Sequence, residues 1–127
     1  MSLFHGVDIE DLERWKRLCD NPRWQGFIRR YFFDGEWNYA WSRAPHRHLA
    51  VRWCAKEAML KAALSLCPGL NLQHIEVILT QEGQPLLKMH HPDWHHDRWQ
   101  VSLSLSHSHQ SAIASVVVWG GYTAFPA

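Results

Sequence analysis

The chain has 127 residues, of which 46% are hydrophobic and 20% charged, and its formal net charge is +1 with histidine neutral. This composition is that of a soluble globular protein with room for a real core, so we expect one domain over residues 1–127. The near-neutral charge removes any bulk electrostatic argument for nucleic-acid binding, and no apolar run is long enough to span a membrane.

The three cysteines, Cys19, Cys54 and Cys67, are odd in number and widely spaced. Such usage indicates reduced thiols and a cytoplasmic setting rather than a disulfide framework. The first ten residues, MSLFHGVDIE, lack the positively charged start and the apolar run of a signal peptide.

The N-terminal third predicts a short strand followed by helices. Residues 2–7 are expected to form the strand. Apolar residues then recur at helical spacing over residues 9–18, and Asp8 precedes them as the candidate N-cap. Residues 24–41 also have a helical pattern, which Asp34-Gly35 interrupts at a point where a new helix can begin.

Residues 49–64, LAVRWCAKEAMLKAAL, contain no Gly or Pro and consist largely of good helix formers. The segment is apolar almost all round, which predicts a helix buried on most sides. Glu57 and Lys61 lie four residues apart on one edge of it. Taken alone, they are either an ordinary salt bridge within the helix or a pair that faces a metal or phosphate cleft.

After Cys67-Pro68-Gly69, which ends the central helix, the periodicity becomes that of strands. Four strands are expected, at residues 74–80, 85–89, 99–105 and 111–119. A short strand, about three helices and then these strands indicate an α+β fold with an antiparallel sheet.

Several polar residues stand at chemically suggestive places in this scheme. Asp8 ends the predicted first strand, Glu57 lies on the buried helix with Lys61 one turn later, and His107 sits in a polar turn between two strands. Two carboxylates that share a phosphate-bearing substrate suit Mg²⁺, which prefers oxygen ligands. A lysine beside them would hold phosphate oxygens as a point charge.

These features lie in segments that resemble the holo-acyl-carrier-protein synthases, a class of 4′-phosphopantetheinyl transferase. The specific matches are GVDIEDLER, residues 6–14, and LAVRWCAKEAMLKA, residues 49–62. Weaker matches are RRYFFDGE, the turn Gly83-Gln84-Pro85, and VSLSLSH followed by SAIASVVV. The resemblance covers most of the chain and implies a 4′-phosphopantetheinyl transferase-like fold.

The resemblance also implies an activity, associated with fatty acid biosynthesis. A serine of an apo acyl carrier protein would take the 4′-phosphopantetheine group of coenzyme A in a Mg²⁺-dependent reaction that releases 3′,5′-ADP. Asp8 and Glu57 match the family's Mg²⁺ ligands, and Lys61 matches the lysine that contacts the phosphates. The positions that match the nucleotide site are Arg52, Gly83, Pro85 and His107. Arg14 matches an arginine that meets the carrier protein.

Members of this family are typically homotrimers with the active site between subunits, so a neighbouring chain would complete the site. One segment departs from the family, because residues 63–69 hold a single glycine where a Gly-rich stretch often follows the lysine. This departure motivates a rival interpretation, a catalytically inactive transferase-like module that binds a carrier protein or an assembly partner. Retention of Asp8, Glu57 and Lys61 together favours the enzyme.

Overall fold

A computed structural model describes residues 1–121 and has the expected α+β architecture. Its elements, in chain order, are β1 Ser2–Asp11, α1 Leu12–Asp20, α2 Pro22–Arg29, α3 Asp34–Trp41, α4 Pro45–Ala63, a 3₁₀ turn Leu72–His74, β2 Ile75–Leu79, β3 Pro85–Met89, β4 Trp99–His107 and β5 Ser111–Gly120. The described residues therefore form four α-helices rather than about three, since the helical segment after Asn21 is divided in two. None of these helices is both long and apolar enough to cross a membrane.

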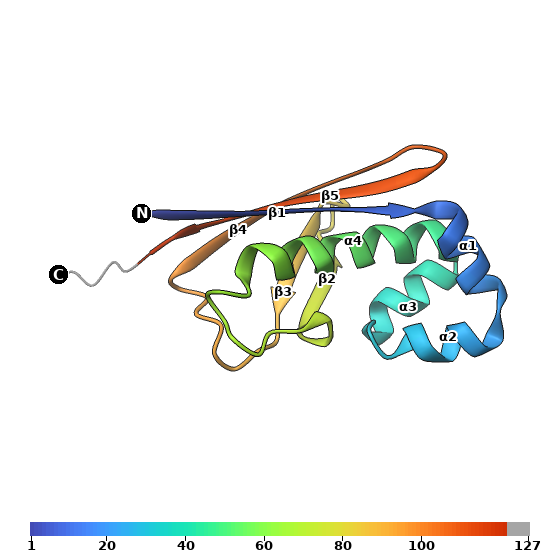
Figure 1. The fold of residues 1–127 in the computed structure, drawn as a ribbon, viewed down its shortest axis with the longest axis horizontal. Helices are drawn as coiled ribbons and strands as arrows, with labels where there is room; N and C mark the ends of the chain where they lie inside the picture. The colour runs from blue at the N-terminus through green and yellow to red at the C-terminus, as the bar shows by residue number, and fades with distance from the viewer. Residues whose placement is uncertain (122–127) are drawn as a thin grey trace.

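The strands form two separate antiparallel sheets. β5 lies between β1 and β4 in a three-stranded sheet, and β2 pairs with β3 in a hairpin. Figure 1 shows α4 running beneath the three-stranded sheet, with α1, α2 and α3 gathered at one end of it. The long helix is thus covered by the sheet, by the small helices and by the hairpin, which is the burial that its composition predicts.

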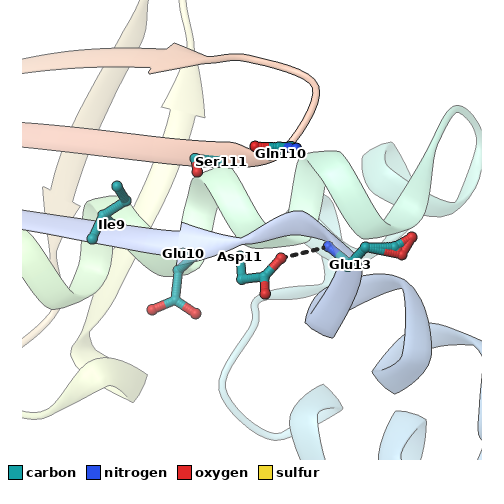
Figure 2. Close-up of a pocket in the computed structure, with 6 residues that line it drawn as sticks. All are labelled: Ile9, Glu10, Asp11, Glu13, Gln110 and Ser111. Carbon is teal, nitrogen blue, oxygen red and sulfur yellow. Dashed lines mark hydrogen bonds between the residues drawn. The ribbon is translucent and has the colours of Figure 1, made fainter.

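The end of β1 differs from the expectation. The strand does not stop at Val7 but pairs with β5 over ten residues as far as Asp11, so Asp8 lies inside the strand and is not the helix N-cap. The N-cap of α1 is Asp11, whose Oδ1 accepts the backbone N–H of Glu13 at 2.9 Å (Figure 2). The spacing of Ile9, Leu12 and Trp15 is helical, but pairing with β5 determines the conformation of Ile9.

The segment between Asn21 and Trp41 breaks at residues 30–33. The Asn21 side chain accepts the backbone N–H of Arg23, and Pro22 occupies the first position of α2, where a missing N–H costs nothing. α3 then begins at Asp34, and Glu36 in its first turn accepts the N–H of Phe33 at 2.8 Å. The Asp34-Gly35 pair therefore starts a helix.

A buried ion pair ties α3 to α4. Lys56 Nζ lies 2.8 Å from Glu36 Oε1, and both side chains are fully shielded from solvent. Glu36 Oε2 also accepts the N–H of Val77 at 2.8 Å, and Lys56 donates to the carbonyl of Ile75. Buried charges are tolerated when they are paired and hydrogen-bonded in this way. The pair therefore connects α3, α4 and β2.

β1 approaches α4 so closely that a side chain does not fit between them at Gly6. A Cβ built on Gly6 would lie 1.9 Å from the carbonyl oxygen of Ala58 and 2.9 Å from the backbone nitrogen of Ala62. Both neighbours are backbone atoms of a helix and cannot rotate away. Glycine is therefore required here for packing, because the strand backbone rests on the helix backbone.

We expect Gly6→Ala to lower the free energy of unfolding by at least about 2 kcal/mol, because the added methyl group forces β1 off α4. Urea unfolding followed by tryptophan fluorescence measures this loss. Gly26→Ala is the matched control, since Gly26 lies within α2 with nothing within 4 Å of its added Cβ. That change should raise stability by about 1 kcal/mol. Equal unfolding midpoints for the two variants would contradict the packing argument.

Candidate active site

The contact between β1 and α4 brings Lys61 to Asp8. Lys61 Nζ lies 3.2 Å from Asp8 Oδ1 and donates to the carbonyl of Val7 at 2.9 Å. The Asp8 side chain is 13% exposed and that of Lys61 is 54% exposed. The salt bridge within the helix, one of the two alternatives, does not form, since Lys61 pairs with the strand and, in the described part of the chain, Glu57 forms no ion pair.

Glu57 lies one turn before Lys61 on α4 and is half-buried. Burial raises the pKa of its carboxyl, the charge of Asp8 raises it further, and Lys61 offsets part of the rise. Glu57 thus has Asp8 and Lys61 as charged neighbours, and these two are themselves paired at 3.2 Å. The three residues singled out for chemistry are thus brought together by the fold.

Glu10 is a neighbour of this group that the sequence analysis did not single out. Its Oε1 accepts the indole N–H of Trp15 at 2.8 Å and pairs with Arg14 Nη1 at 3.3 Å. Burial raises the pKa of Glu10, the Trp15 hydrogen bond lowers it, and the nearby carboxylate of Asp8 raises it again. Had the first strand been predicted to continue to Asp11, Glu10 would have been expected on the same face as Asp8, because residues two apart in a strand share a face.

The group has the character of a divalent-cation site. Asp8 Oδ2 is buried and has no hydrogen-bond partner, which leaves a hard oxygen ligand free. No group of three or more Asp, Glu, His or Cys side chains forms a ready metal cage within residues 1–121. Mg²⁺ fits such an arrangement, because it is commonly held by one or two carboxylates together with substrate phosphates and water.

The four residues matched to nucleotide binding surround a different cavity of about 440 Å³. Arg52 reaches it from α4, His107 from the end of β4, and Gly83 and Pro85 from the β2–β3 hairpin. Gly83 has φ +83°, the left-handed conformation that a glycine adopts without strain, in the turn that closes the hairpin. The fold therefore gathers these positions from three separate elements.

This cavity is rich in cationic groups. Arg52 is 5% exposed, and its Nη1 donates to the carbonyl of His48 at 3.2 Å while its Nε has no partner. Burial lowers the pKa of Arg52. The pKa of His48 is lowered to about 4, mainly by burial and then by the positive charges of Arg52, Arg47 and Arg43. The ring of His48 is therefore neutral at pH 7. Such a lining attracts an anion.

The two groups occupy different sides of α4. Asp8, Glu57 and Lys61 do not line the 440 Å³ cavity. Arg52 and Glu57 are five residues apart, which turns their side chains by roughly 140° around the helix axis. Arg14, an exposed residue of α1, reaches the Asp8 group only indirectly, through its ion pair with Glu10. The Asp8 group and the 440 Å³ cavity therefore face apart within one chain.

Beside Glu10, the end of β1 opens into a further cavity of about 570 Å³. Figure 2 shows its lining, in which Ile9 and Glu10 point to opposite sides of the strand. Three carboxylates and two polar residues contribute to it together with Ile9, namely Glu10, Asp11, Glu13, Gln110 and Ser111. No site residue predicted from the sequence lines this cavity.

Comparisons with known proteins identify relatives of the chain. Residues 5–117 match the family model described as the 4′-phosphopantetheinyl transferase superfamily. A holo-acyl-carrier-protein synthase of Thermodesulfovibrio yellowstonii is 37% identical over 114 residues, which cover 89% of this chain and 95% of that protein. One of Chloroherpeton thalassium is 34% identical over 115 residues, with 89% and 94% covered.

Solved structures show the same fold. An ACPS–CoA complex of Chronobacterium ammoniagenes has a TM-score of 0.80 at 24% identity, with 96% of this chain and 100% of that chain covered. A Bacillus anthracis holo-acyl-carrier-protein synthase in complex with CoA (3′,5′-ADP) has a TM-score of 0.73 at 28% identity, with 94% and 96% covered. The chain belongs to the 4′-phosphopantetheinyl transferase superfamily.

Proposed function

We propose that the chain is a holo-acyl-carrier-protein synthase. It transfers 4′-phosphopantetheine from coenzyme A to a serine of an apo acyl carrier protein in a Mg²⁺-dependent reaction and releases 3′,5′-ADP. The observation that carries the proposal is the approach of Lys61 to Asp8 at 3.2 Å, beside Glu57 and the unpartnered Asp8 Oδ2. The three buried, unpaired cysteines support a cytoplasmic location.

Coenzyme A would lie with its nucleotide in the cationic cavity of one subunit and its pyrophosphate toward Lys61 of a neighbouring subunit. Arg52, with an unpartnered Nε, and His107 offer hydrogen-bond donors to phosphate oxygens there. Gly83 and Pro85 supply a wall of the cavity from the hairpin turn. The Thermodesulfovibrio and Bacillus proteins support this assignment, because the first acts on the same class of carrier by its name and the second binds CoA.

The proposed step is attack of the serine hydroxyl oxygen on the β-phosphorus of coenzyme A. A new serine–phosphorus bond forms, the bond to the bridging oxygen breaks, and 3′,5′-ADP leaves with the electron pair. Lys61 would hold the charge that grows on the phosphate oxygens. Asp8 and Glu57 would hold Mg²⁺, which, when bound, neutralises pyrophosphate charge. Glu57, with its raised pKa, is one candidate to accept the serine proton.

The group of Asp8, Glu57 and Lys61 and the 440 Å³ cavity face apart on one chain, and we treat them as two half-sites of an active site shared between subunits. Such sharing supports assembly into a homotrimer. In such an assembly the Asp8 side of one subunit would face the Arg52 side of the next. The outer face of the three-stranded sheet offers the contact surface, because Leu3, Ile9 and Ile113 are 65%, 63% and 40% exposed there. Ile9 and Ile113 lie directly opposite each other in the β1–β5 register, and exposed apolar residues gathered on one face mark interaction surfaces.

The carrier protein would bind over α1 and α2. Arg14 projects from α1, and α2 exposes Trp24 and Phe27, whose rings pack edge to face at 5.8 Å. Basic and aromatic side chains together suit an acidic amphipathic partner. The ion pair of Arg14 with Glu10 also joins this surface to the neighbour of Asp8.

We expect Asp8→Asn and Glu57→Gln each to lower transfer at least about a hundredfold, because each removes a charge that holds the metal and the pyrophosphate. Mass spectrometry of an apo carrier protein after incubation with coenzyme A measures transfer, with and without removal of Mg²⁺ by EDTA. Thermal stabilisation by Mg²⁺ plus coenzyme A should be lost as well. Glu82→Gln, at the exposed hairpin turn, is the control. Full transfer by a folded Glu57→Gln variant would refute the assigned role of Glu57, whereas no transfer by the unchanged chain would favour the binding module.

For the assembly, we expect Ile113→Asp to convert a trimer into monomers and to abolish transfer, because a charge then enters the apolar sheet face. Sedimentation velocity gives the mass of the species. Leu86→Asp is the matched control, since Leu86 is 43% exposed on β3, away from that face. If the chain without substitutions is a monomer and fully active, an active site shared between subunits is ruled out.

For the carrier surface, we expect Arg14→Gln to raise the KM for the carrier protein about fivefold, which corresponds to about 1 kcal/mol for an exposed charge pair. The KM for coenzyme A should stay the same. The effect should shrink in high salt, since salt screens surface charges. Lys88→Gln, an exposed position on β3, controls for the loss of one positive charge. An equal effect of both substitutions would argue against a specific contact.

A further inference from the structure

α3 and α4 meet in an antiparallel contact that has two successive layers. In the first, Glu36 of α3 pairs with Lys56 of α4 at 2.8 Å. One turn later on α3 comes Tyr39, and one turn earlier on α4 comes Arg52, whose Cζ lies 4.6 Å from the centroid of the Tyr39 ring. The buried ion pair therefore sets the helix register that places the Tyr39 ring against the Arg52 guanidinium.

Arg52 has no acidic partner to hold it. No carboxylate among the described residues forms an ion pair with it, its Nε has no hydrogen-bond partner, and the carbonyl of His48 accepts its Nη1. A guanidinium that is only 5% exposed would normally be paired. The aromatic face of Tyr39 takes the place of that partner, because the ring quadrupole attracts a cation without neutralising it.

Two further side chains, those of Arg43 and His48, contact the Tyr39 ring. The Cζ of Arg43 lies 3.7 Å from the ring centroid of Tyr39, and the His48 ring packs edge-on to it at 5.3 Å. Tyr39 lines the 440 Å³ cavity and also a neighbouring cavity of about 310 Å³, and Arg52 lines both as well. The pair thus forms part of the wall of the cavity assigned to the nucleotide.

We propose that Tyr39 is a positioning residue for coenzyme A binding. Its ring holds the unpaired Arg52 guanidinium in place, so that the free N–H groups of Arg52 stay available to a phosphate of the substrate. A carboxylate in the same place would fix Arg52 equally well but would cancel the charge and repel the phosphate. The inference rests on the proposed function, since it takes Arg52 as a ligand of coenzyme A.

The ring, and not the hydroxyl group, carries this role. Tyr39→Phe keeps the ring, and we expect it to bind coenzyme A within about twofold of the unchanged chain. Tyr39→Met removes the ring but keeps bulk and helix propensity, and we expect its dissociation constant for coenzyme A to rise about tenfold. Isothermal titration with coenzyme A gives the binding constants. Steady-state kinetics should show the loss in KM, with kcat changed little.

A double-mutant cycle with Arg52→Gln shows whether Tyr39 acts through Arg52. Arg52→Gln alone should weaken coenzyme A binding, and adding Tyr39→Met to it should cause little further loss. An undiminished tenfold loss in the Arg52→Gln background would overturn the inference, since Tyr39 would then act independently. So would equal losses in Tyr39→Phe and Tyr39→Met.

Two further outcomes are distinguishable. Arg52→Gln with unchanged coenzyme A binding would contradict the nucleotide site of the proposed function itself, and the role of Tyr39 with it. Circular dichroism and thermal unfolding check that the variants are folded. If Tyr39→Met and a second variant, Tyr39→Leu, both fail to fold, Tyr39 is a core residue and the positioning role is wrong.

Discussion

The backbone of β1 rests directly on the backbone of α4, and the chemistry depends on this contact. Gly6 permits it, because any Cβ at that position would collide with the carbonyl of Ala58. Side chains of a strand alternate, so Asp8 is the next residue of β1 on the same face. It consequently also faces α4, where Lys61 reaches its carboxylate and the carbonyl of Val7. A glycine required for packing thus determines where a carboxylate is placed.

A second constraint acts on the other side of the same helix. α4 carries Lys56 and Arg52 one turn apart toward α3, and both cations are buried. They are stabilised differently, because Lys56 is neutralised by Glu36 whereas Arg52 contacts the ring of Tyr39 and keeps an unpartnered Nε. Lys56 therefore stabilises the fold, whereas the positive charge of Arg52 stays available to a ligand. The distinction is one of partner chemistry, since both residues are cations on the same face of one helix.

The helix therefore carries the two proposed half-sites on different sides, and this arrangement bears on the proposed assembly. A single α-helix separates positions five residues apart by roughly 140°. The Asp8 group and the Arg52 cavity of the same chain therefore do not easily contact one substrate molecule together. Repetition of the chain around a symmetry axis would bring unlike faces together, in line with the exposed apolar face of the three-stranded sheet.

Much of the fold is predictable from local pattern. The residues of α4 lack Gly and Pro and are apolar on nearly all sides, and the strands after Gly69 alternate, so both are recognised with nearly correct bounds. The end of β1 is not, because Ile9, Leu12 and Trp15 fit a helix. The ten-residue pairing with β5 overrides this local preference. Glu10 was missed for the same reason, since it shares a face with Asp8 only if the strand continues.

The amino-acid sequence by itself determined the class of the fold and the buried helix, because these follow from residue type and short-range periodicity, and its resemblance to a family supplied the acidic and basic groups proposed for the site. Tertiary structure alone decided which groups meet. Lys61 is four residues from Glu57 yet pairs with Asp8, 53 positions away along the chain, and Glu36 finds Lys56 across 20 positions. The physical reason is that an ion pair depends on the packing of separate elements, which no local spacing records.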